Sequence, residues 1–271
     1  LADDDLMSVI SSSSFSSLGK GGAIPNEIKT KKKLYGEVVK CTGLSLLGGM
    51  CNRDDKATAI TIKNRLVCVG FRSGKVSSMT IDGEVNGEIT NNKVYDSGAV
   101  TSLDIEDGIL AASHSTGVIH VWNLKNNSHL QKIEVKITDS TVIKVIVIDR
   151  NHLLYMVSQG SVFDVKLTKT LSIRGSESTC LFSGSHGEVL DIQRLKVAKN
   201  HPLFPYCIIG LCTFKQVMLI SLNPYPNIKY SVRLWGDTTT LPVINWYYHE
   251  VDCEKPKLVI GRSKRFVMYS L

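Results

Sequence analysis

The sequence has little that would favour a disulfide framework, a membrane-spanning run or a secretory signal, and we expect none of the three. Its seven cysteines form no C-x-x-C pair and are odd in number, which favours a reduced compartment. The longest apolar run, residues 207–222, is interrupted by Lys215 and Gln216 and is too polar to cross a bilayer. The first residues include Asp3 and Asp5 instead of a basic region. We therefore expect a cytoplasmic location.

The alternation of basic and aromatic residues that stacks nucleic-acid bases is also missing. The formal net charge is +7, and aromatic residues make up 7% of the chain. The positive charge is dispersed, apart from KTKKK at 29–33 and RSKR at 262–265. We expect no nucleic-acid partner, because neither cluster is interleaved with aromatic residues. A moderately basic protein also suits a position beside an anionic membrane surface.

No long amphipathic helical pattern occurs, and the chain has β character after a polar beginning. Residues 1–33 are rich in Ser, Gly and Lys and have little to bury, so we expect a disordered tail. From residue 34 onward Val, Ile and Thr are frequent, and short apolar bursts alternate with polar turns. These features predict an all-β domain over residues 34–271.

A strand–turn–strand unit recurs at a fixed spacing in this domain. Residues 66–81, 109–124 and 153–167 each hold an apolar strand, a polar turn closed by glycine, and an alternating strand. The turn glycines lie 43 residues apart and are Gly74, Gly117 and Gly160. Glycine at such a position supplies the positive φ that a tight hairpin requires. A period of about 40 to 45 residues with four strands per unit is typical of β-propeller blades.

The pattern therefore predicts an all-β, WD-repeat-like β-propeller. Two later hairpins, 207–222 and 258–271, keep the strand–turn–strand shape without the glycine. The strand before each glycine hairpin is expected to be the first or second of its blade. The predicted blade-like units span residues 57–83, 98–126, 140–170, 178–224 and 229–271.

The turn SHSTG (113–117) invites comparison with a catalytic Ser–His–acid triad that would use Asp104. Such a triad needs a strained elbow and an oxyanion hole, and the turn has no G-x-S-x-G frame. The predicted innermost strands, at 58–62, 99–105 and 142–148, are mainly apolar with Thr and Ser. We therefore expect no charged residues converging in a propeller channel, and no enzyme activity.

Metal ligation is not favoured either. His201, Cys207 and Cys212 are close in the sequence, but the two cysteines are separated by an odd offset. On one extended strand that offset directs their side chains to opposite faces. We expect no metal site and no cofactor.

The loop SGSHGE (183–188) is the best candidate for a partner contact. Its glycines and serines leave backbone exposed, so Ser185, His186 and Glu188 could face a partner. The competing interpretation is a tight turn between blade strands.

The aromatic stretch NWYYHE (245–250) is a second candidate. Strand alternation predicts that Trp246 and Tyr248 are buried on one face and that Tyr247 is exposed. Aromatic residues are enriched at interface hot spots, so Tyr247 is a candidate rim contact. Aromatic residues also fill the packing between blades, which is the competing interpretation for the buried pair.

Residues 98–124 resemble a WD repeat, in which Trp122-Asn123 takes the place of the Trp-Asp pair. Ser97-Gly98 stands where Gly-His would be, and Thr116 replaces the acidic residue before the turn glycine. The His–Ser–Trp–Asp hydrogen-bond set of standard repeats is thus largely missing. We expect the blade to depend more on packing.

A closer resemblance, over about residues 57–271, is to the N-terminal propeller of the vacuolar protein sorting-associated protein 8 family. The segment CLFSGSHGEV (180–189) is its most specific piece, and residues 201–224 and 241–250 also carry it. The family belongs to the CORVET endosomal tethering complex, and its propeller precedes a long α-solenoid. The resemblance implies seven blades, of which about five are visible in the sequence.

What the resemblance implies is binding without catalysis. It implies a protein-interaction module in vesicle-mediated transport to the endosome and vacuole, peripheral on endosomal membranes. The implied partners are an early-endosomal Rab GTPase in its GTP form and other tethering-complex subunits. No Rab-contact motif can be carried over residue by residue. The alternatives are a WD-repeat-like scaffold of another trafficking or coat complex, and an enzyme built on a propeller.

Overall fold

The computed structural model describes residues 54–82, 84–89, 97–135, 140–167, 178–195, 207–236, 239–248 and 256–270. The chain divides into two units, residues 1–49 and 50–271, and every described residue lies in the second. The domain start predicted at residue 34 lies outside the described residues. The predicted tail, residues 1–33, lies outside the described residues.

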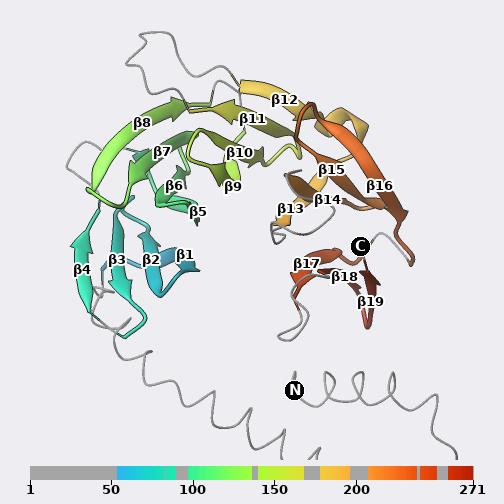
Figure 1. Ribbon diagram of the computed structural model, residues 1–271, viewed down its shortest axis with the longest axis horizontal. Coiled ribbons are helices and arrows are strands. Elements are labelled where there is room, and N and C mark those ends of the chain that lie inside the picture. The colour runs from blue at the N-terminus through green and yellow to red at the C-terminus, as the bar shows by residue number, and fades with distance from the viewer. Residues whose placement is uncertain are drawn as a thin grey trace, which may run out of the picture. The chain divides into compact units, whose positions relative to one another are not determined.

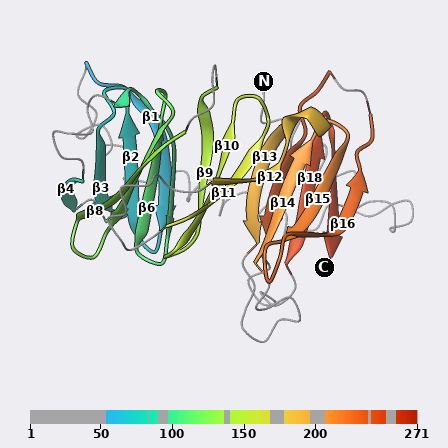
Figure 2. The same cartoon turned by 90° about the horizontal axis from the view of Figure 1, so that it is seen from above.

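The described part of the second unit consists of five antiparallel sheets that follow one another around a common axis (Figures 1 and 2). Four sheets have four strands and the fifth has three. Strands pair in sequence order within each sheet, and the first strand of each lies nearest the axis (Figure 1). This arrangement confirms the all-β propeller fold.

Each sheet is built from consecutive strands of the chain. The first sheet contains β1 (Ala57–Lys63), β2 (Leu66–Phe71), β3 (Val76–Thr80) and β4 (Val85–Glu88). The second contains β5 (Val100–Glu106), β6 (Ile109–His114), β7 (Val118–Asn123) and β8 (Ser128–Glu134). The third contains β9 (Val142–Asp149), β10 (His152–Val157), β11 (Val162–Lys166) and β12 (Ser178–Phe182). The fourth contains β13 (Val189–Leu195), β14 (Ile208–Thr213), β15 (Gln216–Ser221) and β16 (Asn227–Arg233), and the fifth contains β17 (Val243–Tyr247), β18 (Lys257–Arg262) and β19 (Arg265–Ser270). A short 3-10 helix, η2 (Gly184–His186), connects β12 to β13.

Two outer strands, β12 and β16, do not belong to the sheets in which the predicted units 178–224 and 229–271 place them. Strand β12 pairs with β11 and completes the third sheet, and β16 pairs with β15 and completes the fourth. The predicted units are centred on hairpins, whereas the outermost strand of a sheet follows its hairpin after a further connection. The unit boundaries therefore fall after β12 and after β16.

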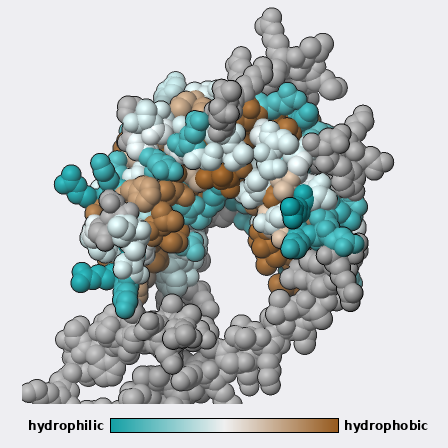
Figure 3. Space-filling view, turned by 180° about the vertical axis from the view of Figure 1, so that it is seen from behind, coloured by the Kyte–Doolittle hydropathy of each residue, from teal (hydrophilic) through white to brown (hydrophobic). Residues whose placement is uncertain are grey.

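Strand β6 is apolar on both faces because the second sheet is packed between the first and the third. In β6, Ile109 and Ala111 belong to the core shared with the third sheet, while Leu110 and Ala112 belong to the core shared with the first. All six residues of β6 are buried. Figure 3 shows hydrophobic residues gathered on the sides of the sheets that face the axis, with hydrophilic residues mainly on the outer side.

Polar side chains of β5 connect the second sheet to the third at the axis. The backbone N–H of Val145 donates to Ser102 Oγ at 3.2 Å, and that of Val147 donates to Asp104 Oδ2 at 2.8 Å. In each pair the partners are 43 residues apart. The separation of 43 residues between the turn glycines is thus also the separation in sequence between residues that bond across neighbouring sheets.

The hairpin turns explain why the glycine signal fades along the chain. Gly74, Gly117 and Gly160 have φ of 90°, 81° and 76°. In the β18–β19 turn Ser263 takes this left-handed conformation, with φ of 56°. The β14–β15 turn is instead held by Thr213, whose Oγ1 accepts from the backbone N–H of Gln216 at 3.1 Å.

The second sheet has polar contacts in addition to its packing. Ser97 Oγ and His120 Nε2 lie 2.9 Å apart, and His120 Nδ1 lies 2.9 Å from His129 Nε2. Thr116 Oγ1 donates to the carbonyl oxygen of Ser97 at 2.6 Å. A different polar network therefore occupies the place of the usual WD-repeat hydrogen bonds.

Candidate functional site

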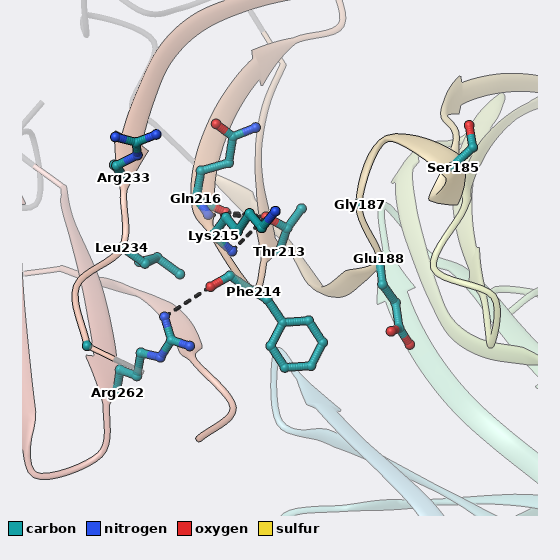
Figure 4. Close-up of a pocket in the computed structure, with 11 residues that line it drawn as sticks. Ser185, Gly187, Glu188, Thr213, Phe214, Lys215, Gln216, Arg233, Leu234 and Arg262 are labelled. Carbon is teal, nitrogen blue, oxygen red and sulfur yellow. Dashed lines mark hydrogen bonds between the residues drawn. The ribbon is translucent and has the colours of Figure 1, made fainter. Parts of the chain in front are cut away.

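Two adjoining cavities form a groove over the fourth and fifth sheets, and Figure 4 shows the larger of them. The larger has a volume of about 690 Å³ and the smaller about 410 Å³. Arg262 and Gly236 line both, so the two are continuous. We call this feature the basic groove. Its basic lining residues are Lys215, Arg233, Arg262, Lys264 and Arg265.

One wall of the basic groove is the β14–β15 turn. Thr213 Oγ1 accepts from the backbone N–H groups of Lys215 at 3.3 Å and Gln216 at 3.1 Å. These bonds fix a tight turn, so the side chains at its tip project from it. Figure 4 shows the ring of Phe214 directed into the space between this turn and Glu188.

The opposite wall comes from the connection between β12 and β13. Gly184 donates from its backbone N–H to Ser161 Oγ at 2.8 Å, which ties this connection to the third sheet. At Gly160 an added Cβ would lie 2.6 Å from Cγ of Glu188 and 2.7 Å from its Cα. Only glycine permits this approach, and the approach sets the position of Glu188 in the wall.

Arg262 lies between the two cavities and is only 3% exposed. Its Nε donates to the carbonyl oxygen of Thr240 at 3.1 Å. Its Nη1 donates to the carbonyl oxygens of Phe214 at 3.0 Å and Trp235 at 3.3 Å. Its Nη2 is buried and has no hydrogen-bond partner among the described residues. The guanidinium is therefore held in place by backbone carbonyls that leave its charge unneutralised.

The charge of the groove is strongly one-sided. Glu188 is the acidic residue among the described residues that line it, against five basic ones. Lys215, Arg233, Lys264 and Arg265 are exposed, and within the described ranges none of them forms an ion pair. Such a lining attracts anionic groups and steers their approach.

The sequence candidates fall in different places. Ser185 and Glu188 line the basic groove. His186 lies in η2, and its side chain is outside the described residues. Tyr247 ends β17 and is 45% exposed, away from the groove lining. Tyr248 is 37% exposed, so its predicted burial is wrong: β17 ends at the preceding residue, and strand alternation no longer applies.

Most of the residues that line the groove are not among the candidate contact residues that the sequence indicates. The RSKR run at 262–265 is visible as a charge cluster, and it supplies Arg262, Lys264 and Arg265. Nothing in the sequence indicates that the first of these is buried while the other two are exposed. The contribution of Phe214 and Lys215 follows from a turn geometry that has no glycine signal.

The innermost strands do bring charged residues together, and the expectation that they would not is wrong. Lys63 Nζ of β1 lies 3.0 Å from Glu106 Oε2 of β5, and Glu106 also pairs with Arg194 of β13. Lys144 of β9 pairs with Asp191 of β13 at 2.5 Å. The prediction considered apolar content and overlooked the polar alternates of each strand. Because these charges pair with one another, we interpret them as links between sheets.

The residues of the rejected triad are also engaged in the structure. His114 is fully buried, and its Nδ1 lies 3.0 Å from the carbonyl oxygen of Gly98. Asp104 accepts the backbone N–H of Val147, and burial raises the pKa of its carboxyl against the lowering effect of Arg194.

The family profile described as the Vps8 beta-propeller matches residues 53–271. The chain belongs to the Vps8 β-propeller family. Vacuolar protein sorting-associated protein 8 homologs are 32% identical over 187 residues in Drosophila melanogaster, 27% over 169 in Mus musculus and 27% over 165 in Homo sapiens. These matches cover 64%, 57% and 56% of this chain, but only 15%, 11% and 11% of the respective relatives.

A solved structure supports the fold of this Vps8-family chain. The β-propeller domain of Myceliophteria thermophila Cps50 (Swd1) superposes with a TM-score of 0.56 at 13% identity, covering 78% of this chain and 63% of that one. At this identity the likeness concerns the fold alone. No helix within the described ranges is long and apolar enough to cross a bilayer.

Proposed function

We propose that this chain is a non-catalytic protein-interaction module of an endosomal tethering subunit. In this role it would bind an early-endosomal Rab GTPase in its GTP form and other subunits of a CORVET-type complex. It would act in the cytoplasm, peripherally on endosomal membranes. The observation that carries the proposal is the match of residues 53–271 to the Vps8 β-propeller family.

The chemistry of the described surface supports binding over catalysis. The buried groups of the rejected triad are held by backbone hydrogen bonds, and the channel charges are paired with one another. The basic groove, by contrast, offers exposed cations around a buried guanidinium group that forms no ion pair within the described ranges. A rigid scaffold that displays functional loops is the usual arrangement of a binding module.

The Rab part of the proposal is tested by a pull-down with the 271-residue chain as bait. An early-endosomal Rab GTPase is loaded with a GTP analogue or with GDP, and a Rab of another compartment serves as the control. We expect retention only of the early-endosomal Rab in its GTP-analogue form. Equal retention of both nucleotide forms, or no retention, would contradict the Rab assignment and favour a scaffold of another trafficking complex.

A further inference from the structure

We propose that the basic groove binds an extended acidic peptide segment of a partner protein. A carboxylate of the segment pairs with Arg262, and an apolar side chain lies against Phe214 and Trp235. The inference rests on the proposed function as an interaction module, and it names the surface and the chemistry of the partner.

Arg262 needs a carboxylate partner. A buried guanidinium that lacks one is costly, because its charge has been removed from water without compensation. Three hydrogen bonds to carbonyl oxygens hold Arg262 in place, yet Nη2 remains without a partner among the described residues. Within the described ranges no carboxylate forms an ion pair with it. The uncompensated charge of this buried guanidinium attracts a carboxylate that enters the groove, and local movement of the lining would let the two form a charge-assisted pair.

The other cations of the groove are distributed along its length. Lys264 and Arg265 line the smaller cavity, and Lys215 and Arg233 line the larger. A single ion would engage one end of the groove. A chain with several carboxylates would engage both.

Apolar surface lies between these charges. Phe214 and Leu234 line the larger cavity and Trp235 the smaller. An inositol phosphate headgroup or a free phosphate has no apolar group to place against these side chains, whereas a peptide does. The apolar walls therefore favour a peptide over a lipid headgroup.

The position of Glu188 gives the segment a direction. Figure 4 places Glu188 across the cavity from Phe214, on the side away from Arg262. Because Glu188 repels carboxylates, the acidic residues of the segment would lie on the side of Arg262, Lys264 and Arg265. The apolar residue would then face Phe214.

Fluorescence anisotropy with the whole chain tests the proposal. The probe is a labelled synthetic peptide of glutamate and aspartate residues that contains one phenylalanine and one leucine. We expect saturable binding that weakens as salt is raised. A peptide with glutamine and asparagine in place of the acidic residues should bind at least about tenfold more weakly, as expected when charge-assisted pairs are lost.

Charge reversal locates the site. Lys264→Glu/Arg265→Glu changes exposed residues of the groove and should weaken binding about tenfold or more. Lys125→Glu/Lys166→Glu changes the net charge equally at exposed positions on the second and third sheets and should leave binding unchanged. Phe214→Ala should weaken binding of the probe more than that of a probe without phenylalanine and leucine. Circular dichroism confirms that each variant is folded.

Several outcomes would overturn the proposal. One is equal binding of the acidic peptide and the amide peptide. Another is an equal loss of peptide affinity in the groove variant and in the control variant. A third is binding of phosphoinositide vesicles or inorganic phosphate at the groove while the peptide does not bind. The Rab assay separates the two proposals. Nucleotide-dependent Rab retention without peptide binding contradicts only the groove proposal, and peptide binding without Rab retention contradicts only the Rab assignment.

Discussion

Gly70 in β2 lies at a close approach between the first and second sheets. A Cβ added at this position would lie 2.4 Å from Cγ1 of Val100 and 2.7 Å from its Cβ. Val100 begins β5 and is 1% exposed, so it has little room to move. The absence of a side chain at Gly70 therefore sets the distance between two neighbouring sheets.

We expect Gly70→Ala to lower the free energy of unfolding by about 1–3 kcal/mol, the usual cost of overpacking. Urea denaturation measures the change. Gly261→Ala is the matched control, because its added Cβ would meet nothing closer than a carbonyl oxygen 4.0 Å away in another strand of the same sheet. Val100→Ala removes the methyl groups nearest the added Cβ and leaves only its own Cβ at 2.7 Å, so it relieves part of the clash. The free energy of unfolding of the double variant Gly70→Ala/Val100→Ala should therefore fall by less than the sum of the two single losses. Additive losses would contradict the assigned contact.

At the scale of the element, the second sheet holds three histidines in one connected network. His120 in β7 is 3% exposed and lies between Ser97 and His129. Burial, with the charges of His114, His129 and Lys132 acting in the same direction, lowers the pKa of His120 to about 3. Burial also lowers the pKa of His114 and of His129. The network is therefore neutral at physiological pH.

This network predicts that the chain loses stability as the pH falls below about 6.5, the pKa of an unfolded histidine. The unfolded chain then binds protons that the folded chain does not, until the pH reaches the folded pKa of about 3 for His120. At pH 5 the loss from this histidine alone is about 2 kcal/mol. Raised pKa values such as that of Asp104 act in the opposite direction.

Urea denaturation between pH 7.5 and 5 compares the wild-type chain with His120→Gln, which keeps a polar group near Ser97. We expect the pH dependence of the free energy of unfolding to be shallower in the variant. The same slope in both chains would contradict the network as its source.

The elements were predictable where a local constraint repeats. Gly74, Gly117 and Gly160 marked three hairpins because each turn needs a positive φ that glycine adopts without strain. The β18–β19 turn was harder to place, because Ser263 adopts the same conformation without a sequence signal. The sheet assignment of β12 and β16 depends on pairing across loops, which no local pattern records.

At the scale of the whole molecule, the residues that line the groove and the charges that pair in the channel could not be predicted from the sequence, and the reason is the same for both. Both join residues from different sheets: Glu188 and Arg262 lie across the groove, and Arg194 of β13 reaches Glu106 of β5 in the channel. Periodicity predicts which face of a strand is apolar, but not which strands meet at the axis. The family resemblance implied the ring, and the structure was needed to show which charges it brings together.

Glu106 is the centre of the channel network, and it links three sheets. It accepts from Lys63 of β1 at 3.0 Å and from Arg194 of β13, whose side chain is 11% exposed. Arg194 also lies 3.9 Å from Asp104. Through these contacts the fourth sheet is tied to the second directly, without the third sheet between them.

We expect Glu106→Gln to destabilise the chain by about 3–5 kcal/mol, because it leaves two cations of the channel without their shared carboxylate. Arg194→Met should cost less, since Glu106 keeps its pair with Lys63. The free energy of unfolding of the double variant should fall by less than the sum of the two single losses, which would reveal the coupling between Glu106 and Arg194. Lys144→Met is the control, because it breaks the more exposed pair with Asp191 and should cost about 1 kcal/mol. If Arg194→Met proved as damaging as Glu106→Gln in urea denaturation, the central position of Glu106 in the network would be wrong.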